Sequence, residues 1–575
     1  MNAERLLQHY EQITEAPDAI ARLRRFILDL AMRGKLVPQD PADEPASELL
    51  KQIAAEKARL VKAGEIRKPK VLEPVDRPPF ELPHSWNWVR IRQVTSDRGQ
   101  EVPTDAFTYI DVGAINKEVG VVGEPSILDA SEAPSRARKV VRRGDVIYSC
   151  VRPYLLNIAV IDTDFVPKPI ASTAFAVLNG HGYVVPRYIW TVLRSPFMVE
   201  CVEETQRGLA YPAINDADFA VLPFPLPPLA EQHRIVAKVD ELMALCDELE
   251  AARTERETKR DRLAAASLAR LNAPDLETFR DDARFALDAL PALTARPDQI
   301  KQLRQTILNL AVRGKLVPQD PTDEPAEELL KRIFAEKKRL MAEKGIRGQK
   351  PALPAENFEM DTDIPETWQH VYLQDIAYQI TDGTHLTPKY TETGKPFLSA
   401  QNVKPFRFMP EKHRFVSEQD FDSYRANRRP ERGDILLTRV GAGIGEAAVL
   451  DSDFEFAFYV SLCLIKVPTC CINVEYLVLW LNSPEGRDSS SSRTYGKGAS
   501  QGNLNLGLIR TFKIPLPPLA EQHRIVAKFD ELMALCDQLE VSLTSADETR
   551  KKLLDALLAE ALAPVDAIAL QEAAE

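Results

Sequence analysis

Few residues of this chain have the types and spacing that bond-making chemistry requires. Glycines at 441, 443 and 445 could form a cofactor turn, and Arg77-Pro78-Pro79-Phe80 has the outline of a base-binding methyltransferase loop. However, an arginine stands where that loop needs a hydrogen-bond acceptor, and the loop precedes the glycines by some 360 residues. We therefore interpret the glycines as a turn between strands.

Other catalytic signatures fail in the same way. The sequence has neither GxxxxGK[ST] nor HExxH,. Asp298 with Glu336 and Lys338 has the composition of a nuclease site, but the first copy of this stretch has Ala58 instead of the last lysine, as a charged helix face would allow. Seven scattered cysteines form no CxxC pair,. The sequence predicts no enzyme activity, no metal site and no cofactor bound by this chain.

The elements that position these residues are written twice. Residues 23–60 recur at 303–340 with 29 of 38 positions identical, and residues 225–247 recur at 515–537 with one change, Val239 to Phe529. The segments between the repeats share only landmarks, such as Arg143-Gly144-Asp145 and Arg432-Gly433-Asp434, which we interpret as turns before strands. A scaffold that is kept while its inserts diverge predicts that the identical parts meet identical partners, or each other through a pseudo-two-fold axis, and that the inserts meet different ligands.

Helical patterns dominate the scaffold. Leu23, Ile27 and Leu30 share a helical face that ends near Gly34, and Asp43 with Pro45 fits the first turn of a second helix,. A long helix is predicted over 229–270, with a heptad seam at Ile235, Val239, Leu242, Cys246 and Leu249 and at the matching positions of the second copy,. About 63 Å long, such a helix could set the distance between two domains.

The predicted fold class is α+β: two globular α/β domains joined by two long antiparallel coiled-coil helices in a pseudo-two-fold arrangement. Strands are expected at 146–148 and 435–437, and short helices at 189–193 and 474–481,. The predicted segments are a helical scaffold repeat at 1–83, domain 1 at 84–224, a long helix at 225–275, a second scaffold repeat with linker at 276–363, domain 2 at 364–514, and a second long helix at 515–575.

The charge of the chain is unevenly distributed. Of the net −12, domain 1 carries −2 and domain 2 carries 0, which leaves −10 in the helical scaffold. Neutral domains can carry local basic faces, although neither domain is strongly basic overall. No apolar run of about 18 residues occurs, and the N-terminus is polar, so the sequence predicts no membrane span and a cytoplasmic location,.

The doubled Pro-Leu-Pro-Pro-Leu-Ala-Glu-Gln-His-Arg-Ile-Val and the doubled Arg-Gly-Lys-Leu-Val-Pro-Gln-Asp-Pro resemble the specificity subunit of Type I restriction-modification systems. So does Asp-Gly-Thr-His-Leu-Thr-Pro at 382–388, although domain 1 reads Asp-Arg-Gly-Gln at 97–100 instead. The resemblance implies two target-recognition domains, each reading half of an asymmetric bipartite site in double-stranded DNA. It also implies two methyltransferase subunits that use S-adenosylmethionine and two restriction subunits (ATP-driven translocases, with Mg²⁺), with that chemistry on the partners.

Major-groove reading favours arginine and lysine at guanine and asparagine and glutamine at adenine, while phosphate contacts outnumber base contacts. The candidate DNA-binding residues of domain 1 are Arg136, Arg138, Lys139, Arg142, Arg143, Arg152, Tyr154, Arg207, Tyr211 and Asn215. Those of domain 2 are Thr384, His385, Arg425, Arg428, Arg429, Arg439, Lys497, Ser500, Gln501 and Asn503.

Two other functions compete with DNA reading. A self-contained DNA methyltransferase would need the cofactor motif that the sequence lacks. A structural adaptor between two protein partners would not need two unlike domains on identical scaffolds, so we favour DNA reading.

Overall fold

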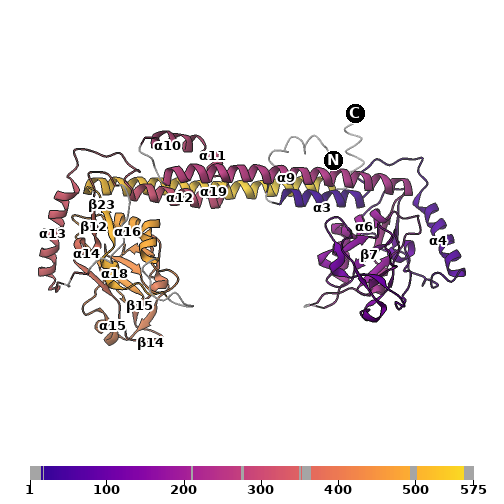
Figure 1. The fold of residues 1–575 in the computed structure, drawn as a ribbon, viewed down its shortest axis with the longest axis horizontal. Coiled ribbons are helices and arrows are strands. Elements are labelled where there is room, and N and C mark those ends of the chain that lie inside the picture. Colours follow the sequence, from indigo (N-terminus) through magenta and orange to yellow (C-terminus); the bar gives the residue numbers. More distant parts are fainter. Residues whose placement is uncertain are drawn as a thin grey trace. The chain divides into compact units, whose positions relative to one another are not determined.

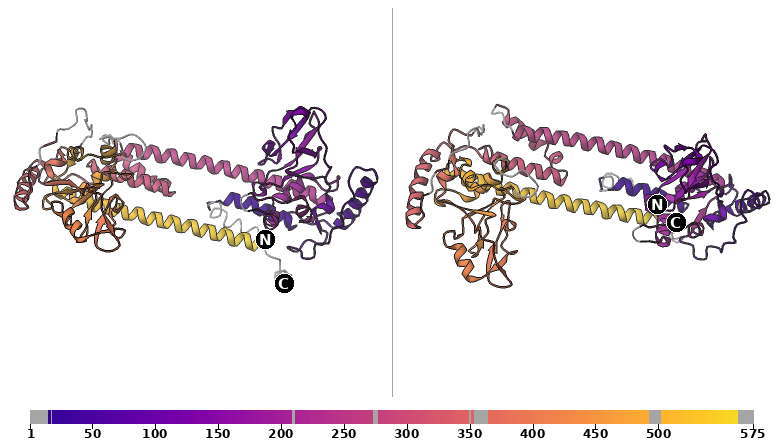
Figure 2. Two further views of the ribbon diagram at one scale, coloured as in Figure 1. Left: turned by 90° about the horizontal axis from the view of Figure 1, so that it is seen from below. Right: turned by 60° about the horizontal axis from the view of Figure 1, so that its bottom comes forward.

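The computed structural model describes residues 15–16, 18–208, 211–272, 277–348, 351–352, 364–491 and 502–562. The chain divides into two compact units, one of residues 1–256 with 547–575 and the other of residues 257–546. Both long helices, α9 (Leu229–Asn272) and α19 (Leu519–Leu562), begin in one unit and end in the other. Figure 1 labels the elements, and Figure 2 shows α9 and α19 as unbroken ribbons. Helix α9 begins at the residue that the sequence predicted.

The scaffold helices of the two copies are equivalent. They are α3 (Ala19–Met32) and α4 (Ala46–Lys62) in the first unit, and α12 (Pro297–Val312) and α13 (Ala326–Glu343) in the second. Gly34 lies just past the end of α3 with a φ of 66°, and a Cβ there would come within 2.3 Å of the Pro83 ring, so the helix end requires glycine,. Helix α4 begins later than predicted, because Pro45 is extended and serves as its N-cap.

Domain 1 is built on three small sheets of order β10-β7-β8-β4-β3, β5-β2-β9-β6 and β1-β11. Its strands are β1 (Asn87–Arg90), β2 (Phe107–Ile110), β3 (Ile115–Asn116), β4 (Val121–Val122), β5 (Ser126–Leu128), β6 (Ala137–Val140), β7 (Val146–Ser149), β8 (Ile158–Val160), β9 (Pro169–Ser172), β10 (Phe175–Leu178) and β11 (Pro223–Leu226). Its α-helices are α5 (Ile91–Val94), α6 (Pro186–Arg194), α7 (Pro196–Thr205) and α8 (Asp216–Ala220), with 3-10 turns η1 (Val112–Ala114), η2 (Ala130–Glu132) and η3 (Pro153–Leu155). The predicted strand at 146–148 and helix at 189–193 are confirmed.

Domain 2 has sheets of order β13-β22-β19-β20, β14-β18-β15-β21, β16-β17 and β12-β23. Its strands are β12 (Gln369–Tyr372), β13 (Gln379–Asp382), β14 (Tyr390–Thr391), β15 (Lys395–Leu398), β16 (Val403–Lys404), β17 (Arg407–Phe408), β18 (Arg414–Val416), β19 (Ile435–Thr438), β20 (Ala447–Val449), β21 (Ala457–Phe458), β22 (Leu462–Lys466) and β23 (Lys513–Leu516). Its helices are α14 (Leu373–Ile376), η4 (Ala400–Asn402), α15 (Glu418–Arg425), α16 (Val474–Asn482), α17 (Pro484–Ser491) and α18 (Leu506–Arg510), and α10 (Phe279–Asp288) and α11 (Leu290–Leu293) precede α12. Its predicted strand and helix are also confirmed.

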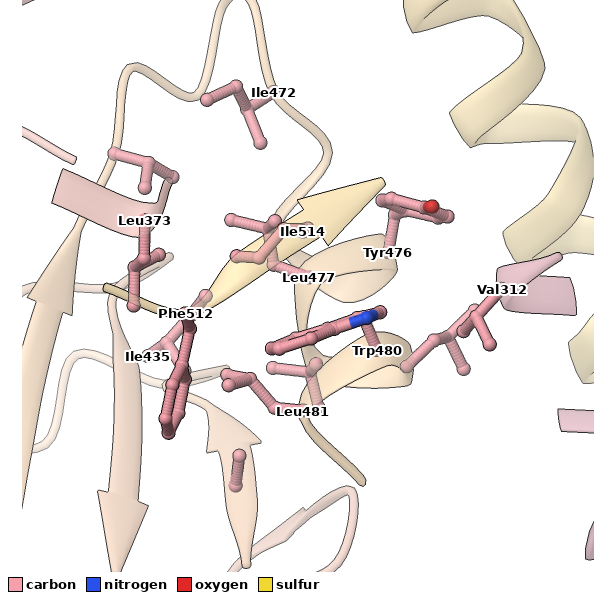
Figure 3. Close-up of a cluster of buried hydrophobic side chains, with 14 of the residues drawn as sticks. Val312, Leu373, Ile435, Ile472, Tyr476, Leu477, Trp480, Leu481, Phe512 and Ile514 are labelled. Atoms are coloured by element: carbon pink, nitrogen blue, oxygen red, sulfur yellow. The ribbon is translucent and has the colours of Figure 1, made fainter. Parts of the chain in front are cut away.

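The core of the second unit joins domain 2 to its scaffold. Tyr476 and Trp480 of α16 are fully buried, and Val312 at the end of α12 belongs to the same cluster. Figure 3 shows Val312 beside Trp480, with Phe512 and Ile514 on the domain side of the helix. Helix α12 and domain 2 therefore share one continuous core.

The proline-rich entry to each long helix belongs to the domain before it. Strand β11 pairs antiparallel with β1, so that Pro225 lies opposite Trp88, and β23 pairs with β12 in the same way. The boundaries drawn after residues 224 and 514 therefore cut through a strand, because the prolines that stiffen this segment also allow it to form a two-stranded edge ladder.

The apolar seam in the first half of α9 packs within its own unit. Ile235, Val239 and Cys246 are buried in the cluster that holds α3 and domain 1, and Arg24 of α3 pairs with Asp247 at 2.5 Å. The seam therefore meets a scaffold helix of its own copy, since an apolar stripe specifies a buried face and leaves the partner open.

Contacts along α3 give the direction of both long helices in the first unit. Arg253 donates to the carbonyl of Ala16, whereas Arg24 reaches back to Asp247, so α9 runs antiparallel to α3. Leu554 of α19 packs on Ala16 and Ala19, and Lys35 bonds the carbonyl of Leu562, so the end of α19 runs parallel to α3. The end of α19 is therefore antiparallel to residues 247–253 of α9, as predicted.

Candidate nucleic-acid interface

The repeated motif at the start of each long helix is a structural junction. We define the junction as Gln39, Trp86 and Glu231 in the first unit and Gln319, Trp368 and Glu521 in the second. Trp86 Nε1 donates to Glu231 Oε2 at 2.9 Å and Gln39 Nε2 donates to Oε1 at 2.5 Å; the second copy has 3.0 and 2.6 Å. Both glutamates are buried, and burial raises their pKa.

Further bonds lock each junction. Gln232 accepts a hydrogen bond from Val185 N, and Tyr188 Oη donates to the carbonyl of Pro225. Arg234 pairs with Asp43 at 2.6 Å, as Arg524 does with Asp323. The doubled Ala-Glu-Gln-His-Arg sequence is thus kept because it ties three elements together, and each copy presents its own domain from the same mount.

One group of candidates in domain 1 lies together around two adjacent loops. Isolated bridges join Ala213 to both Val151 and Arg207, so the segment after β7 lies beside Arg207 and residues 211–215. There the Arg152 guanidinium lies over the ring of Tyr211, 5.0 Å from its centroid. Tyr154 is 52% exposed and Tyr211 is 69% exposed. Arg207 is exposed and pairs with Asp218 at 3.0 Å.

The other arginines of domain 1 do not join this group. Arg142 and Arg143 precede β7, at the opposite end of the strand from Arg152, and both are exposed. Arg143 pairs with Asp164 at 3.3 Å across the surface. Arg136 is exposed just before β6, and half-buried Arg138 donates to the carbonyl of Ala137.

Two candidates of domain 1, the buried Lys139 and the exposed Asn215, have structural roles. Lys139 is 3% exposed, and its ammonium pairs with Asp97 at 2.7 Å and Asp216 at 3.0 Å. Asn215 caps α8, where its side chain accepts hydrogen bonds from two backbone amides of the first turn. Because the ion pairs of Lys139 and the cap made by Asn215 engage their polar groups, both residues stabilise the local structure of domain 1.

Arg439 holds the centre of domain 2 together. It is 6% exposed and pairs with Asp382 at 2.6 Å. It also donates to the carbonyl of Leu504 and to Asn503 Oδ1. Asp382 belongs to the Asp-Gly-Thr-His sequence, so this motif begins with a buried carboxylate that orients Arg439. A cation with this many partners positions its neighbours.

The remaining described candidates of domain 2 divide by exposure. Thr384 is buried beside Tyr459, and Arg425 is buried against Phe421 and pairs with Glu455 at 3.0 Å. His385 is exposed and lies 3.0 Å from Asp382. The exposed or half-buried members are His385, Arg428, Arg429 and Asn503. Lys497, Ser500 and Gln501 lie outside the described residues.

Arg428 and Arg429 line a cavity of about 970 Å³ between α13 and domain 2. Lys344 and Lys466 also line it, and both pair with Glu431. Asp434, packed on Lys466 at 2.6 Å, has its pKa raised to about 6 by burial.

The sequence interpretation missed Val151 and Leu155, which are 41% and 38% exposed in the loop that carries Arg152. The alignment of residues 143–157 with 432–446 could have found them, because it sets an apolar, side-chain-rich loop against a glycine-rich one. The turn interpretation of the glycines is confirmed: Gly441 and Gly445 lie between β19 and β20 with φ of 104° and 83°.

Within the described residues, no cluster of three or more metal-ligating side chains occurs. The same part of the chain contains no helix of the length and hydropathy that crossing a bilayer requires.

Comparisons with known proteins agree on one family. The model of the Type I restriction modification DNA specificity domain matches residues 167–257 and 365–545. The specificity subunit of the Type I restriction enzyme EcoAI of Escherichia coli is 31% identical over 94% of this chain and 93% of its own length, and that of EcoEI is 31% identical over 94% of each. The crystal structure of the HsdS subunit from Thermoanaerobacter tengcongensis, at 25% identity, covers 84% of this chain and 98% of its own, with a TM-score of 0.46. The chain therefore belongs to the family of Type I restriction enzyme specificity subunits.

Proposed function

We propose that this chain is the DNA-reading subunit of a Type I restriction-modification complex and that each domain reads one half of an asymmetric bipartite site. The observation that carries the proposal is the junction: nearly identical bonds mount two domains whose exposed loops differ. Identical mounts with different loops suit one task performed on two different half-sites. The family assigns this chain to recognition, so bond-making chemistry falls to its partners.

The exposed candidates supply the reading surface. In domain 1 they are Arg136, Arg142, Arg143, Arg152, Tyr154, Arg207 and Tyr211, besides Asn215, which is exposed but caps α8; in domain 2 they are His385, Arg429 and Asn503, together with half-buried Arg428. Arginine pairs bidentately with guanine and asparagine with adenine, while the other cations track phosphates. Half-buried Arg138 stays a candidate on its residue type alone, as do Lys497, Ser500 and Gln501 outside the described residues.

The proposed partners follow from an exposed surface that recurs on both long helices, most clearly at Leu245 and Leu535, which are apolar. His233, Glu241 and Leu245 of α9 are exposed, and their equivalents in α19 are the same residues and are also exposed. Leu245 and Leu535 are each 47% exposed. Since exposed positions drift unless something contacts them, we propose that each long helix binds one copy of the same methyltransferase subunit, which carries S-adenosylmethionine. Two restriction subunits with ATP and Mg²⁺ complete the complex.

Expression of the chain with its methyltransferase tests both proposals. Sequencing of modified bases in the host DNA should give one bipartite motif, methylated on both strands, and native mass spectrometry should give two methyltransferase subunits per chain. Modification without a defined sequence would overturn the reading function. A complex that saturates at one methyltransferase would overturn the repeated-surface argument alone.

A further inference from the structure

The loop between β7 and β8 of domain 1 has an unusual backbone. We call residues 151–156 the 151–156 loop. Arg152 has a φ of 50° and Leu156 a φ of 53°, and the 3-10 turn η3 lies between them. Both angles fall in the left-handed region, which bulky residues other than glycine rarely adopt.

Domain 2 builds the same turn from glycine. The shared Arg-Gly-Asp before the strand aligns Arg152 with Gly441 and Leu156 with Gly445, and both glycines have positive φ. Bridges confirm the alignment, because Val151 pairs with Ala213 and Val440 pairs with Asn503 at the matching positions. The turn therefore needs positive φ at both points, and domain 1 accepts side chains where domain 2 has none.

Packing accounts for only one of these side chains. Leu156 packs against the core of domain 1, and Pro153 between the two strained residues is buried. Arg152 is exposed, and its guanidinium stacks on the ring of Tyr211. Strain that the interior does not require is a mark of function.

The surroundings of Arg152 suit insertion into nucleic acid. Val151, Tyr154, Leu155 and Tyr211 are 38 to 69% exposed and lie on the two adjacent loops. Apolar and aromatic groups of this size, exposed beside a guanidinium, match the base edges and the negative potential of a DNA groove. Stacking on Tyr211 and the bond from Arg152 N to the carbonyl of Pro212, at 2.8 Å, hold the arginine in place before DNA arrives,.

We propose that the 151–156 loop with Tyr211 is the base-reading element of domain 1. Arg152 donates to a base edge from its stacked position, and Tyr154 and Leu155 supply apolar contact to neighbouring bases. The proposal rests on the function proposed above and deepens it, because it assigns specificity to one loop of one domain.

Because the backbone of Arg152 is strained, replacing it with glycine should not lower the thermal stability. In the complex with the methyltransferase, Arg152→Gly should raise the Tm or leave it unchanged, because glycine adopts the same φ without strain. The same variant should reduce discrimination at the first half-site roughly ten- to hundredfold, the value of a good bidentate contact, and leave the second half-site intact. Tyr211→Ala should weaken the first half-site as well, whereas Tyr211→Phe, which keeps the ring, should not.

Gly144→Ala is the matched control. Gly144 has a φ of 88°, and no atom lies within 4 Å of a Cβ placed there, so only the backbone angle opposes the change. It should lower the Tm and leave sequence preference unchanged. Full first-site discrimination by Arg152→Gly, or equal loss at both half-sites, would overturn the assignment. A wild-type complex without sequence preference would instead refute the proposed function itself.

Discussion

Asp29 of α3 shows how one residue distinguishes the two copies. The second copy has Asn309 at this position, where its amide donates to Asn272 Oδ1 at 2.9 Å. Burial raises the pKa of Asp29 to about 6, although nearby Arg33 opposes the shift. The folded chain therefore holds this proton more tightly than the unfolded chain, in which an aspartate has a pKa of about 3.9. The stability that Asp29 contributes is greatest below about pH 4 and is lost as the pH rises to about 6.

Asp29→Asn should remove this pH-dependent loss. At pH 7.5 the variant should be more stable than the wild type by roughly 1–2 kcal/mol, and at pH 4 the two should be nearly equal. Urea unfolding between pH 4 and 8 measures the difference. A difference that does not change with pH would show that the charge of Asp29 is not its source.

The same scale explains why sequence alone could not sort the candidate residues. Lys139 and Arg439 look like Arg142 and Arg428 in the sequence, and they become structural only through carboxylates far along the chain. Arg439, for example, lies 57 positions from Asp382. Residue type predicts what a side chain can bind, whereas burial depends on partners that the fold brings in.

At the scale of elements, periodicity predicted most of the scaffold. The start of α9, the strands β7 and β19 and the helices α6 and α16 follow from apolar spacing and proline positions. Most of the other short strands carry no such signal, since a single alternation fits helix or strand equally well. The sequence could not predict what the seam packs against. Ile235 and Cys246 lie in the cluster that holds α3 and domain 1, and residue spacing does not encode such tertiary contacts.

The length of the long helices should set the distance between the half-sites. Residues 243–249 are unsuitable for deletion, because Cys246 and Asp247 there contact α3. Residues 251–257 and their equivalents 541–547 are mostly exposed, and the contacts of Arg253 and Arg256 with Ala16 and Glu15 are polar ones outside the apolar core. Deleting both segments removes two turns and about 10 Å from each helix, so the spacer of the modified motif should shorten by roughly three base pairs.

Methylome sequencing measures that spacer directly. Both half-sites should persist in the deletion variant, and deleting only one of the two segments serves as the control, because it leaves the helices unequal and should impair modification. If the spacer of the matched variant stays unchanged while modification survives, the helices do not measure distance.

At the scale of the whole molecule, each unit is completed by the tail of the other copy's long helix. In the first unit, Leu554 packs on Ala16 and Ala19, and Ala561 packs on Phe26. In the second, the tail of α9 brings Ala264 and Leu271 to a different cluster, and Asn272 bonds Thr306 at 3.1 Å. The tail of α9 has Ala264 and Leu271 where the tail of α19 has Leu554 and Ala561, so large and small residues change places between the two contacts. Each tail therefore fits its own contact better than the other tail would.

This difference between the two tails affects how strongly residues 1–295, expressed alone, should dimerise. Residues 1–295 contain the first scaffold helices, domain 1 and all of α9, but they lack residues 547–562. A second copy could supply its α9 tail to α3, and two identical domains related by a two-fold axis would then read an inverted repeat. Ala264 and Ser267 would replace Leu554 and Leu557, leaving apolar surface of α3 uncovered, and Leu271 would crowd Phe26 in place of Ala561. The half should dimerise, but weakly.

Grafting the missing contacts should strengthen that dimer. The triple substitution Ala264→Leu, Ser267→Leu and Leu271→Ala gives α9 the tail of α19 at the residues that contact α3, and the two added leucines should tighten dimerisation at least about tenfold. Ultracentrifugation of residues 1–295, with and without the triple substitution, measures the association. Methylome sequencing with the methyltransferase should show a palindrome made of the first half-site, and the substituted form should modify it more completely. If residues 1–295 associate equally with and without the triple substitution, the tail of α9 does not form the dimer contact. A grafted dimer that modifies a non-palindromic site would exclude the two-fold arrangement.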